Sequence, residues 1–372
     1  MSESPDLTVY YDDVFLEHAP PSGAFEMPPS DLLAVDEPHP DRRERIQNVR
    51  QAIRETLDDL TGWPAVTPAT DEQLERVHDP AYLAELREHS ETGGARLTRT
   101  TAVSEKTYEA ARHAAGAAIQ AAEQAASNDR SVPYALVRPS GHHAQPAQAD
   151  GFCYVNNVAV AAEELLRRAD IDRIAILDWD VHPGNGTQEI FYDRDDVVFL
   201  SLHNDFGAWG PSHPQTCRLD ERGTGDGEGY TVNIPLPPGT GDAGYDYAFK
   251  RIVEPVVSSF DPDLVLVSAG QDPGQLDPTA RNLVTKAGFE NLGQRVRGLA
   301  DAVADGRLAI VQEGGYQYSH LAFATLGVLE GVLDYDTGVE DPWGLLEEYE
   351  PPARDWVDRA VDVHAANWPV RE

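Results

Sequence analysis

The sequence IAILDWDVHPGNGT, residues 174–187, joins a short apolar run to a group of polar side chains. Its first four residues are typical of a buried β-strand, and Asp178, Asp180 and His182 follow directly. Because alternate residues of an extended strand share a face, we expect these three side chains to point the same way, about 6–7 Å apart. Paired carboxylates at an apolar strand end need a cation or a hydrogen-bond network to offset repulsion and lost hydration. We interpret them as a metal site; the alternative is a turn in which the aspartates cap the next helix.

Three other predicted strands also end in polar side chains. In an open parallel sheet, ligands bind beyond the carboxyl ends of the strands, so these ends are expected to form one site. Taken singly, each has a structural explanation: histidines in a loop, an aspartate capping a turn, or a tyrosine packed in the core. The strands and the side chains that follow them are 132–137 with His142 and His143, 263–269 with Asp272, and 308–311 with Tyr316.

Strand and helix patterns alternate through most of the chain. With near-continuous apolar strands, this order predicts an α/β fold: a single domain with a mostly parallel central sheet and helices on both faces. Helical spacing or helix-forming composition is found at 40–60, 80–89, 104–126, 157–169, 245–259, 285–304 and 319–333. We expect an irregular N-terminal arm over 1–40, a catalytic domain over 41–335, and an acidic C-terminal extension over 336–372 packed on the same domain.

The composition argues against some classes of function and some cellular locations. The chain of 372 residues has a net charge of -35 and only three lysines, which argues against direct binding to nucleic acid. Carboxylates spread along the whole sequence favour adaptation to a high-salt cytoplasm over a dedicated basic partner. Two cysteines form neither a disulfide framework nor a zinc-knuckle pattern, and neither a signal peptide nor a membrane span is visible. We therefore expect a soluble cytoplasmic protein.

Six motifs together resemble the histone deacetylase family, in particular its class II branch and the bacterial histone deacetylase-like and acetylpolyamine amidohydrolases. They occur in the family's order and cover roughly residues 75–335. The resemblance implies an arginase-like α/β fold and one zinc ion bound by Asp180, His182 and Asp272, a nitrogen and oxygen ligand set that suits catalytic zinc. The motifs are RPSGHHA at 138–144, GFCYVNNVAVA at 151–161, ILDWDVHPGNGTQEIF at 176–191, GYTVNIPLPPGTG at 229–241, SAGQDPGQLDP at 268–278 and VQEGGY at 311–316.

The same resemblance implies roles for five catalytic residues. His142 and His143 are expected beside the attacking water, and Tyr316 beside the acyl oxygen of the substrate. Asp178 is expected to bind His142 and favour its charged form, whereas Asn185 binds the second histidine without adding charge. His143 is then the better neutral base.

The resemblance also implies a narrow channel for the acyl-lysine stem. Phe152 matches one wall, and Gly151 and Gly314 match positions where the backbone lies close to the substrate. The second aromatic wall is less well defined by the sequence, where Trp209 or Phe206 could supply it.

The expected cofactors and partners follow from this family. A potassium ion is expected near backbone oxygens of Asp178, Asp180, His182, Ser201 and Leu202. The implied reaction is hydrolysis of the amide of an acetylated protein lysine or a small N-acetylated amine to acetate and free amine. The sequence leaves open whether identical chains associate.

Two alternatives stay open at this point. An arginase-like binuclear manganese hydrolase would need Asp-x-His-x-Asp, and Gly184 occupies the last position of that pattern. A catalytically silent acyl-amine binder would not need His142, His143 and Tyr316. The chain also departs from the family at Gln271, which we expect to make the mouth of the site more polar.

Overall fold

The computed structural model describes most of the chain. The described residues are 6–21, 31–98, 100–127, 131–205, 216–344, 346, 348 and 350–370. All statements about the structure below concern these residues.

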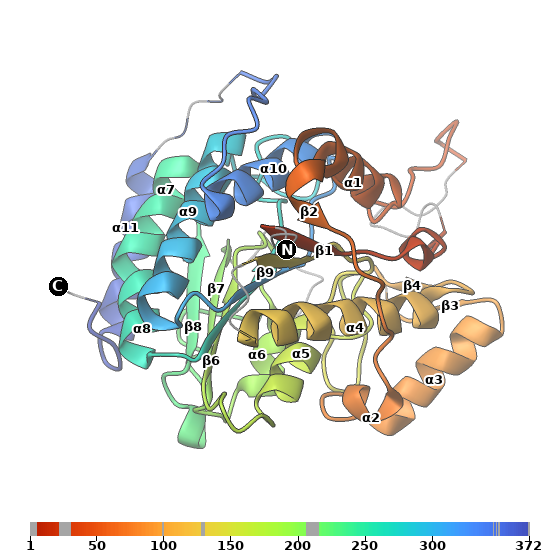
Figure 1. Cartoon of the computed structure of the whole chain (residues 1–372), viewed down its shortest axis with the longest axis horizontal. Coiled ribbons are helices and arrows are strands. Elements are labelled where there is room, and N and C mark those ends of the chain that lie inside the picture. Colours follow the sequence, from red (N-terminus) through yellow and green to blue (C-terminus); the bar gives the residue numbers. More distant parts are fainter. Residues whose placement is uncertain are drawn as a thin grey trace.

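A sheet of eight strands forms the centre of the molecule (Figure 1). Its order is β2-β1-β5-β10-β9-β6-β7-β8, and every pairing between these strands is parallel. Because parallel strands are covered on both faces, their apolar runs are almost fully buried, as the sequence predicted. The strands are β1 (Leu7–Tyr10), β2 (Thr61–Gly62), β5 (Val132–Ala135), β6 (Ile174–Asp178), β7 (Val197–Asn204), β8 (Thr231–Leu236), β9 (Leu264–Ala269) and β10 (Leu308–Gln312); β3 (Ala95–Arg96) and β4 (Ala102–Val103) form a separate antiparallel pair.

Helices cover both faces of this sheet (Figure 1). Helices α4, α5 and α6 contact one face, and α7 to α11 with α1 form the layer on the other side. The α/β prediction is therefore confirmed. The helices are α1 (Glu44–Thr56), α2 (Asp71–Leu74), α3 (Pro80–Glu91), α4 (Thr107–Ala126), α5 (Asn157–Leu165), α6 (Asn185–Phe191), α7 (Asp242–Ala248), α8 (Glu254–Phe260), α9 (Lys286–Val303), α10 (His320–Leu333) and α11 (Glu350–His364). Short 3-10 helices lie at Asp13–Leu16, Asp58–Leu60 and Gly225–Gly227, and a π-helical segment, Phe249–Val253, joins α7 to α8.

Both ends of the chain contribute elements that lie in or against the central sheet. Strand β1 lies between β2 and β5, so this part of the expected irregular arm over 1–40 belongs to the central sheet. At the other end, α11 packs on β8 and α7, and His364 contacts the backbone oxygen of Asn233 at 2.9 Å. The acidic composition of 336–372 concealed this helix, whose buried stripe consists of only five residues.

Four neighbouring strands carry the polar strand ends. In the sheet order, β5, β10, β9 and β6 are consecutive and parallel, so the four motifs lie side by side at the carboxyl ends of the central strands. The register aligns them: Ser268 of β9 is opposite both Asp178 of β6 and Val311 of β10, and Val311 is opposite Ala135 of β5. Residues that follow these positions consequently meet at the middle of the sheet.

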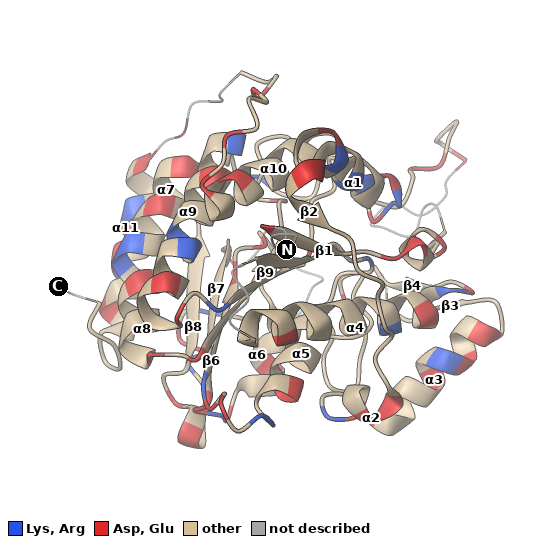
Figure 2. Ribbon diagram, viewed as in Figure 1, with Lys and Arg blue, Asp and Glu red and all other residues tan. Residues whose placement is uncertain are grey.

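Acidic side chains occur on helices and loops around the whole molecule (Figure 2). This distribution agrees with the excess of carboxylates in the sequence. No helix among the described residues is both long and apolar enough to cross a bilayer.

Candidate metal centre and active site

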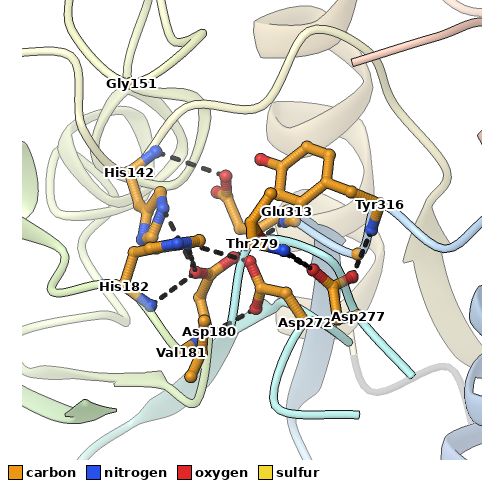
Figure 3. Close-up of polar contacts among 12 residues, drawn as sticks. His142, Gly151, Asp180, Val181, His182, Asp272, Asp277, Thr279, Glu313 and Tyr316 are labelled. Atoms are coloured by element: carbon orange, nitrogen blue, oxygen red, sulfur yellow. Dashed lines mark hydrogen bonds and ion pairs between the residues drawn. The ribbon is translucent and has the colours of Figure 1, made fainter. Parts of the chain in front are cut away.

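Asp180, His182 and Asp272 form a buried group of metal-ligand type (Figure 3). The Nδ1 atom of His182 lies 3.1 Å from Asp180 Oδ1 and 3.0 Å from Asp272 Oδ2. The first two residues follow β6 and the third follows β9, so the pairing of these strands brings them together. One nitrogen and two carboxylate oxygens therefore face a common centre.

Backbone amides fix the two carboxylates. Gly314 N donates to Asp180 Oδ2 at 2.8 Å, and Val181 N donates to Asp272 Oδ1 at 2.9 Å. The other oxygen of Asp272, Oδ2, is buried, has no backbone donor among the described residues and faces the His182 ring, whose Nδ1 is 3.0 Å away. A buried carboxylate oxygen without a donor is costly, and a cation at the common centre would satisfy it.

Two glycines allow the backbone to approach these carboxylates. A Cβ atom on Gly270 would lie 2.2 Å from Asp180 Oδ2, and one on Gly314 would lie 2.2 Å from Asp272 Oδ2. Any side chain at either position would displace a ligand. The sequence analysis assigned Gly314 to the substrate channel, whereas its amide and Cα lie against the carboxylates of Asp180 and Asp272.

The donor set fits a divalent metal. Burial and the adjacent Asp180 carboxylate raise the pKa of Asp272, because two carboxylates share one buried site. Nitrogen and oxygen ligands with three protein donors match catalytic zinc. The helix-cap alternative is wrong, because α6 begins without a side-chain cap from the described residues and the aspartates bind elsewhere.

The arrangement of residues 178–182 differs from one extended strand. Strand β6 ends at Asp178, and Asp180 and His182 lie in the loop that follows. Asp178 turns to His142, with 2.9 Å between Oδ2 and Nδ1, while its Oδ1 accepts the Asp180 amide at 3.0 Å. The three side chains therefore do not share one face as strand alternation predicted: Asp178 binds His142, whereas Asp180 and His182 face Asp272.

The adjacent histidines have different partners and opposite pKa shifts. Burial opposes the charged form of His142, but the carboxylates of Asp180 and Asp178 outweigh burial and hold its pKa well above the usual value. His143 Nδ1 lies 2.6 Å from Asn185 Oδ1. Burial, with the positive charges of His142 and His182, lowers the pKa of His143 well below its usual value.

Tyr316 lies on the opposite side of the group from His142 (Figure 3). Its ring is 6.4 Å from the His182 ring and meets the Phe152 ring edge-on at 5.6 Å. The Arg45 guanidinium lies 4.6 Å from its centroid. Burial raises the pKa of the Tyr316 hydroxyl well above its usual value, so the hydroxyl remains a proton donor in hydrogen bonds.

Phe152 and Gly151 occupy a backbone turn close to His143. Their φ angles are 68° and 48°, and a Cβ on Gly151 would lie 2.2 Å from His143 Cδ2. Gly151 is thus required for the close approach to the histidine. Trp209 and Phe206 fall outside the described residues.

Gln271 does not face the mouth of the site, and that expectation was wrong. The side chain is buried, and its Oε1 accepts a hydrogen bond from Gln312 Nε2 at 2.6 Å. Odd and even positions after a strand point in opposite directions, so a residue next to a ligand can enter the core.

Three residues near the site were not assigned roles from the sequence. Glu313 Oε2 accepts the Gly141 amide at 2.7 Å, and burial raises the pKa of Glu313 to about 8. Arg45 of α1 donates to the backbone oxygens of Gly315, at 2.6 Å, and Glu313, at 2.8 Å. Asp277 binds the Tyr316 amide at 2.6 Å. Glu313 and Asp277 lie inside quoted motifs, but Arg45 is a helix residue far from them in the sequence.

Comparison with known proteins identifies the family. The family model described as histone deacetylase domain matches residues 39–332. The chain belongs to the histone deacetylase family. This membership supports deacetylase or amidohydrolase activity and agrees with the resemblance seen in the motifs.

Relatives of this histone deacetylase-family chain cover nearly all of it. It is 39% identical to histone deacetylase 8 of Arabidopsis thaliana over 96% of both chains. It is 36% identical to a histone deacetylase-like amidohydrolase of Pseudomonas aeruginosa, over 96% of this chain and 95% of the relative. Its structure is similar to the crystal structure of the HDA15 HD domain, with a TM-score of 0.85, 30% identity, and coverage of 98% and 96%. The arginase/deacetylase fold is thereby confirmed.

Proposed function

We propose that this chain is a zinc-dependent deacylase that hydrolyses the amide of acetylated amines to acetate and a free amine. One observation carries the proposal: a buried nitrogen and oxygen ligand group lies between a pair of histidines and a tyrosine hydroxyl group. A metal site alone would need neither the histidines nor the tyrosine.

Asp180, His182 and Asp272 would hold the zinc ion. When bound there, zinc would supply Lewis acidity to the acyl carbonyl and to water. The two carboxylates reduce the net charge of the site, and the amides of Gly314 and Val181 keep them oriented. We also propose a potassium site near Asp178, Asp180, His182, Ser201 and Leu202; Asp178 and Ser201 are already neighbours in the sheet.

His143 would act as general base toward the attacking water. Its neutral form is favoured by burial and by the adjacent positive charge of His142, and its Nδ1–H can donate to the Asn185 amide oxygen. That hydrogen bond fixes the tautomer in which Nε2 carries the lone pair that accepts a proton. His142, which is paired with Asp178, would remain charged and stabilise the negative charge that develops on the acyl group.

The Tyr316 hydroxyl would donate a hydrogen bond to the acyl oxygen in the transition state. Its pKa is too high for it to lose its proton, so it acts as a fixed dipole rather than as an acid. The protonated His143 would then return a proton to the leaving amine. Gly151 and Phe152 would form one wall of the channel that receives the acyl-amine stem.

The substrate class includes acetylated protein lysine and small N-acetylated amines such as acetylpolyamines. Relatives include named histone deacetylases and a histone deacetylase-like amidohydrolase, names that support hydrolysis of an acyl amide. A screen of acetylated peptides, acetylpolyamines and acylated dyes in high salt, with and without chelator, tests the proposal. We expect turnover that is lost on chelation and restored by zinc. Tight binding of these compounds without turnover by the zinc-loaded protein would instead indicate an acyl-amine binder.

A further inference from the structure

Asp277 joins the loop that follows Asp272 to the backbone of Tyr316 (Figure 3). Its Oδ2 atom accepts hydrogen bonds from the amides of Tyr316, at 2.6 Å, and Gln317, at 3.2 Å. Its Oδ1 atom accepts from the amide and hydroxyl of Thr279, at 2.9 Å and 2.7 Å. One partly buried carboxylate therefore satisfies donors from two separate segments.

The Asp277 loop is itself held at several points. Asp277 N donates to Gly274 O at 3.0 Å, and Gly274 N donates to Gln271 O at 3.1 Å. Val284 N donates to Pro273 O at 3.0 Å, which ties the loop to the start of α9. The position of Asp277 relative to Asp272, five residues earlier, is consequently fixed by the fold.

Tyr316 depends on its backbone for position because its segment is a glycine turn. Gly315 has a φ of 119°, and Gly314 and Gly315 have no side chains that could anchor the turn. Arg45 donates to the oxygen of Gly315 and lies over the Tyr316 ring. Asp277 accepts a hydrogen bond from the backbone N–H of Tyr316 itself, the atom bonded to the Cα that carries the phenol side chain.

We infer that Asp277 is a positioning residue that sets the distance from the metal ligands to the Tyr316 hydroxyl. The inference rests on the proposed function, in which that hydroxyl binds the acyl oxygen. The loop begins at the proposed metal ligand Asp272 and ends at Asp277, which accepts the Tyr316 amide. One segment therefore positions both groups that would bind the acyl oxygen, the metal and the Tyr316 hydroxyl. Oxyanion donors stabilise a transition state only at the right distance, and a displacement of 1 Å can cost about 100-fold in rate.

Two substitutions of Asp277 remove different numbers of its hydrogen bonds to the Tyr316 segment and to Thr279. Asp277→Asn keeps one acceptor oxygen and can serve the Tyr316 amide or Thr279 but not both, whereas Asp277→Ala loses all four hydrogen bonds. We expect kcat to fall about 10- to 100-fold in Asp277→Ala and less in Asp277→Asn, with KM and zinc content unchanged. Asp336→Asn is a matched control, because Asp336 also accepts a backbone amide, that of Gly338 at 2.7 Å, in an exposed turn.

A double-mutant cycle with Tyr316→Phe provides the decisive measurement on zinc-loaded protein with an acetylated peptide. If Asp277 acts through the tyrosine hydroxyl, Asp277→Asn will lower kcat in the wild-type background and leave kcat of Tyr316→Phe unchanged. Equal losses in both backgrounds, loss of zinc, or normal kcat in both Asp277 variants would overturn the inference. Crystal structures of metal-free wild type and Asp277→Asn give a readout independent of activity: Tyr316 should move while Asp180, His182 and Asp272 stay in place.

The cycle also distinguishes this inference from the proposed function. Normal turnover in Tyr316→Phe would remove the tyrosine from the reaction and overturn the positioning role, whereas absence of turnover by the zinc-loaded wild type would overturn the proposed function itself. Impaired turnover in Tyr316→Phe, with Asp277→Asn additive to it, would retain the proposed function and overturn the positioning role alone.

Discussion

His143 and Asn185 are joined by a contact of 2.6 Å between imidazole Nδ1 and amide oxygen, whereas the adjacent His142 has a carboxylate partner. A neutral partner orients the ring without stabilising its charged form. Two successive histidines are thereby given different protonation states by the residues behind them.

Replacing that amide with a carboxylate should change the pH profile. In Asn185→Asp, the new negative charge will raise the pKa of His143, so the base is protonated up to a higher pH. The acidic limb of the kcat/KM profile should move up by about 1–3 pH units, with activity lowered at pH 7 and recovered in alkali. An unshifted profile in a correctly folded, zinc-loaded variant would exclude His143 as the base.

Removing the tyrosine hydroxyl should affect turnover rather than folding. Tyr316→Phe keeps the ring contacts with Phe152 and Arg45 but loses the donor to the acyl oxygen. We expect kcat to fall about 10²–10³-fold, the usual loss for one oxyanion donor. Steady-state kinetics and thermal unfolding of the same preparation check this, and near-normal kcat would contradict the role.

Adding one methyl group at Gly270 should weaken metal binding. Its Cβ would lie 2.2 Å from Asp180 Oδ2, so the carboxylate must move. We expect zinc affinity to fall about 10- to 100-fold in Gly270→Ala, measured by competition with a chromophoric chelator. Gly298→Ala in α9 is the control: in the described structure its Cβ meets nothing within 4 Å, and zinc affinity should be unchanged. Equal affinities in both variants would contradict the placement of Asp180 as a ligand.

His78 should make stability depend on pH. Burial lowers its pKa to about 4, and the ring is committed to its neutral form because Nε2 accepts the Asn156 amide at 2.9 Å. The unfolded chain binds this proton near pH 6.5 and the folded chain only near pH 4, so stability falls as the pH drops between these values.

The comparison of wild type with His78→Gln isolates this contribution from that of other groups. Glutamine does not titrate, so the stability advantage of wild type should shrink by up to about 3 kcal/mol between pH 6.5 and pH 4. Urea unfolding at several pH values measures the difference. A constant difference across the range would show that the histidine titrates normally.

The acidic surface should make stability depend on salt. Asp and Glu residues far outnumber Lys and Arg and are found on many helices and loops (Figure 2), and the repulsion among their charges is screened at high ionic strength. We expect a higher melting temperature in molar potassium chloride than in dilute buffer. Equal melting temperatures in both would count against an origin in a high-salt cytoplasm.

The sequence by itself determined which chemistry is present and where each strand ends. Strands β6, β9 and β10 end at Asp178, Ala269 and Gln312, within one residue of the end of each apolar run in the sequence. The motifs that follow therefore specified the candidate ligands, the histidine pair and the tyrosine.

Only the tertiary structure decided how these residues face one another. Strand order places β5, β10, β9 and β6 side by side, an order that depends on contacts between residues far apart in the chain. It also turned Gln271 into the core, placed Gly314 against the Asp180 carboxylate and brought both Arg45 and Asp277 to the Tyr316 segment. Local patterns fix periodicity and strand ends, but the orientation of a loop side chain depends on the packing of segments that no local pattern encodes.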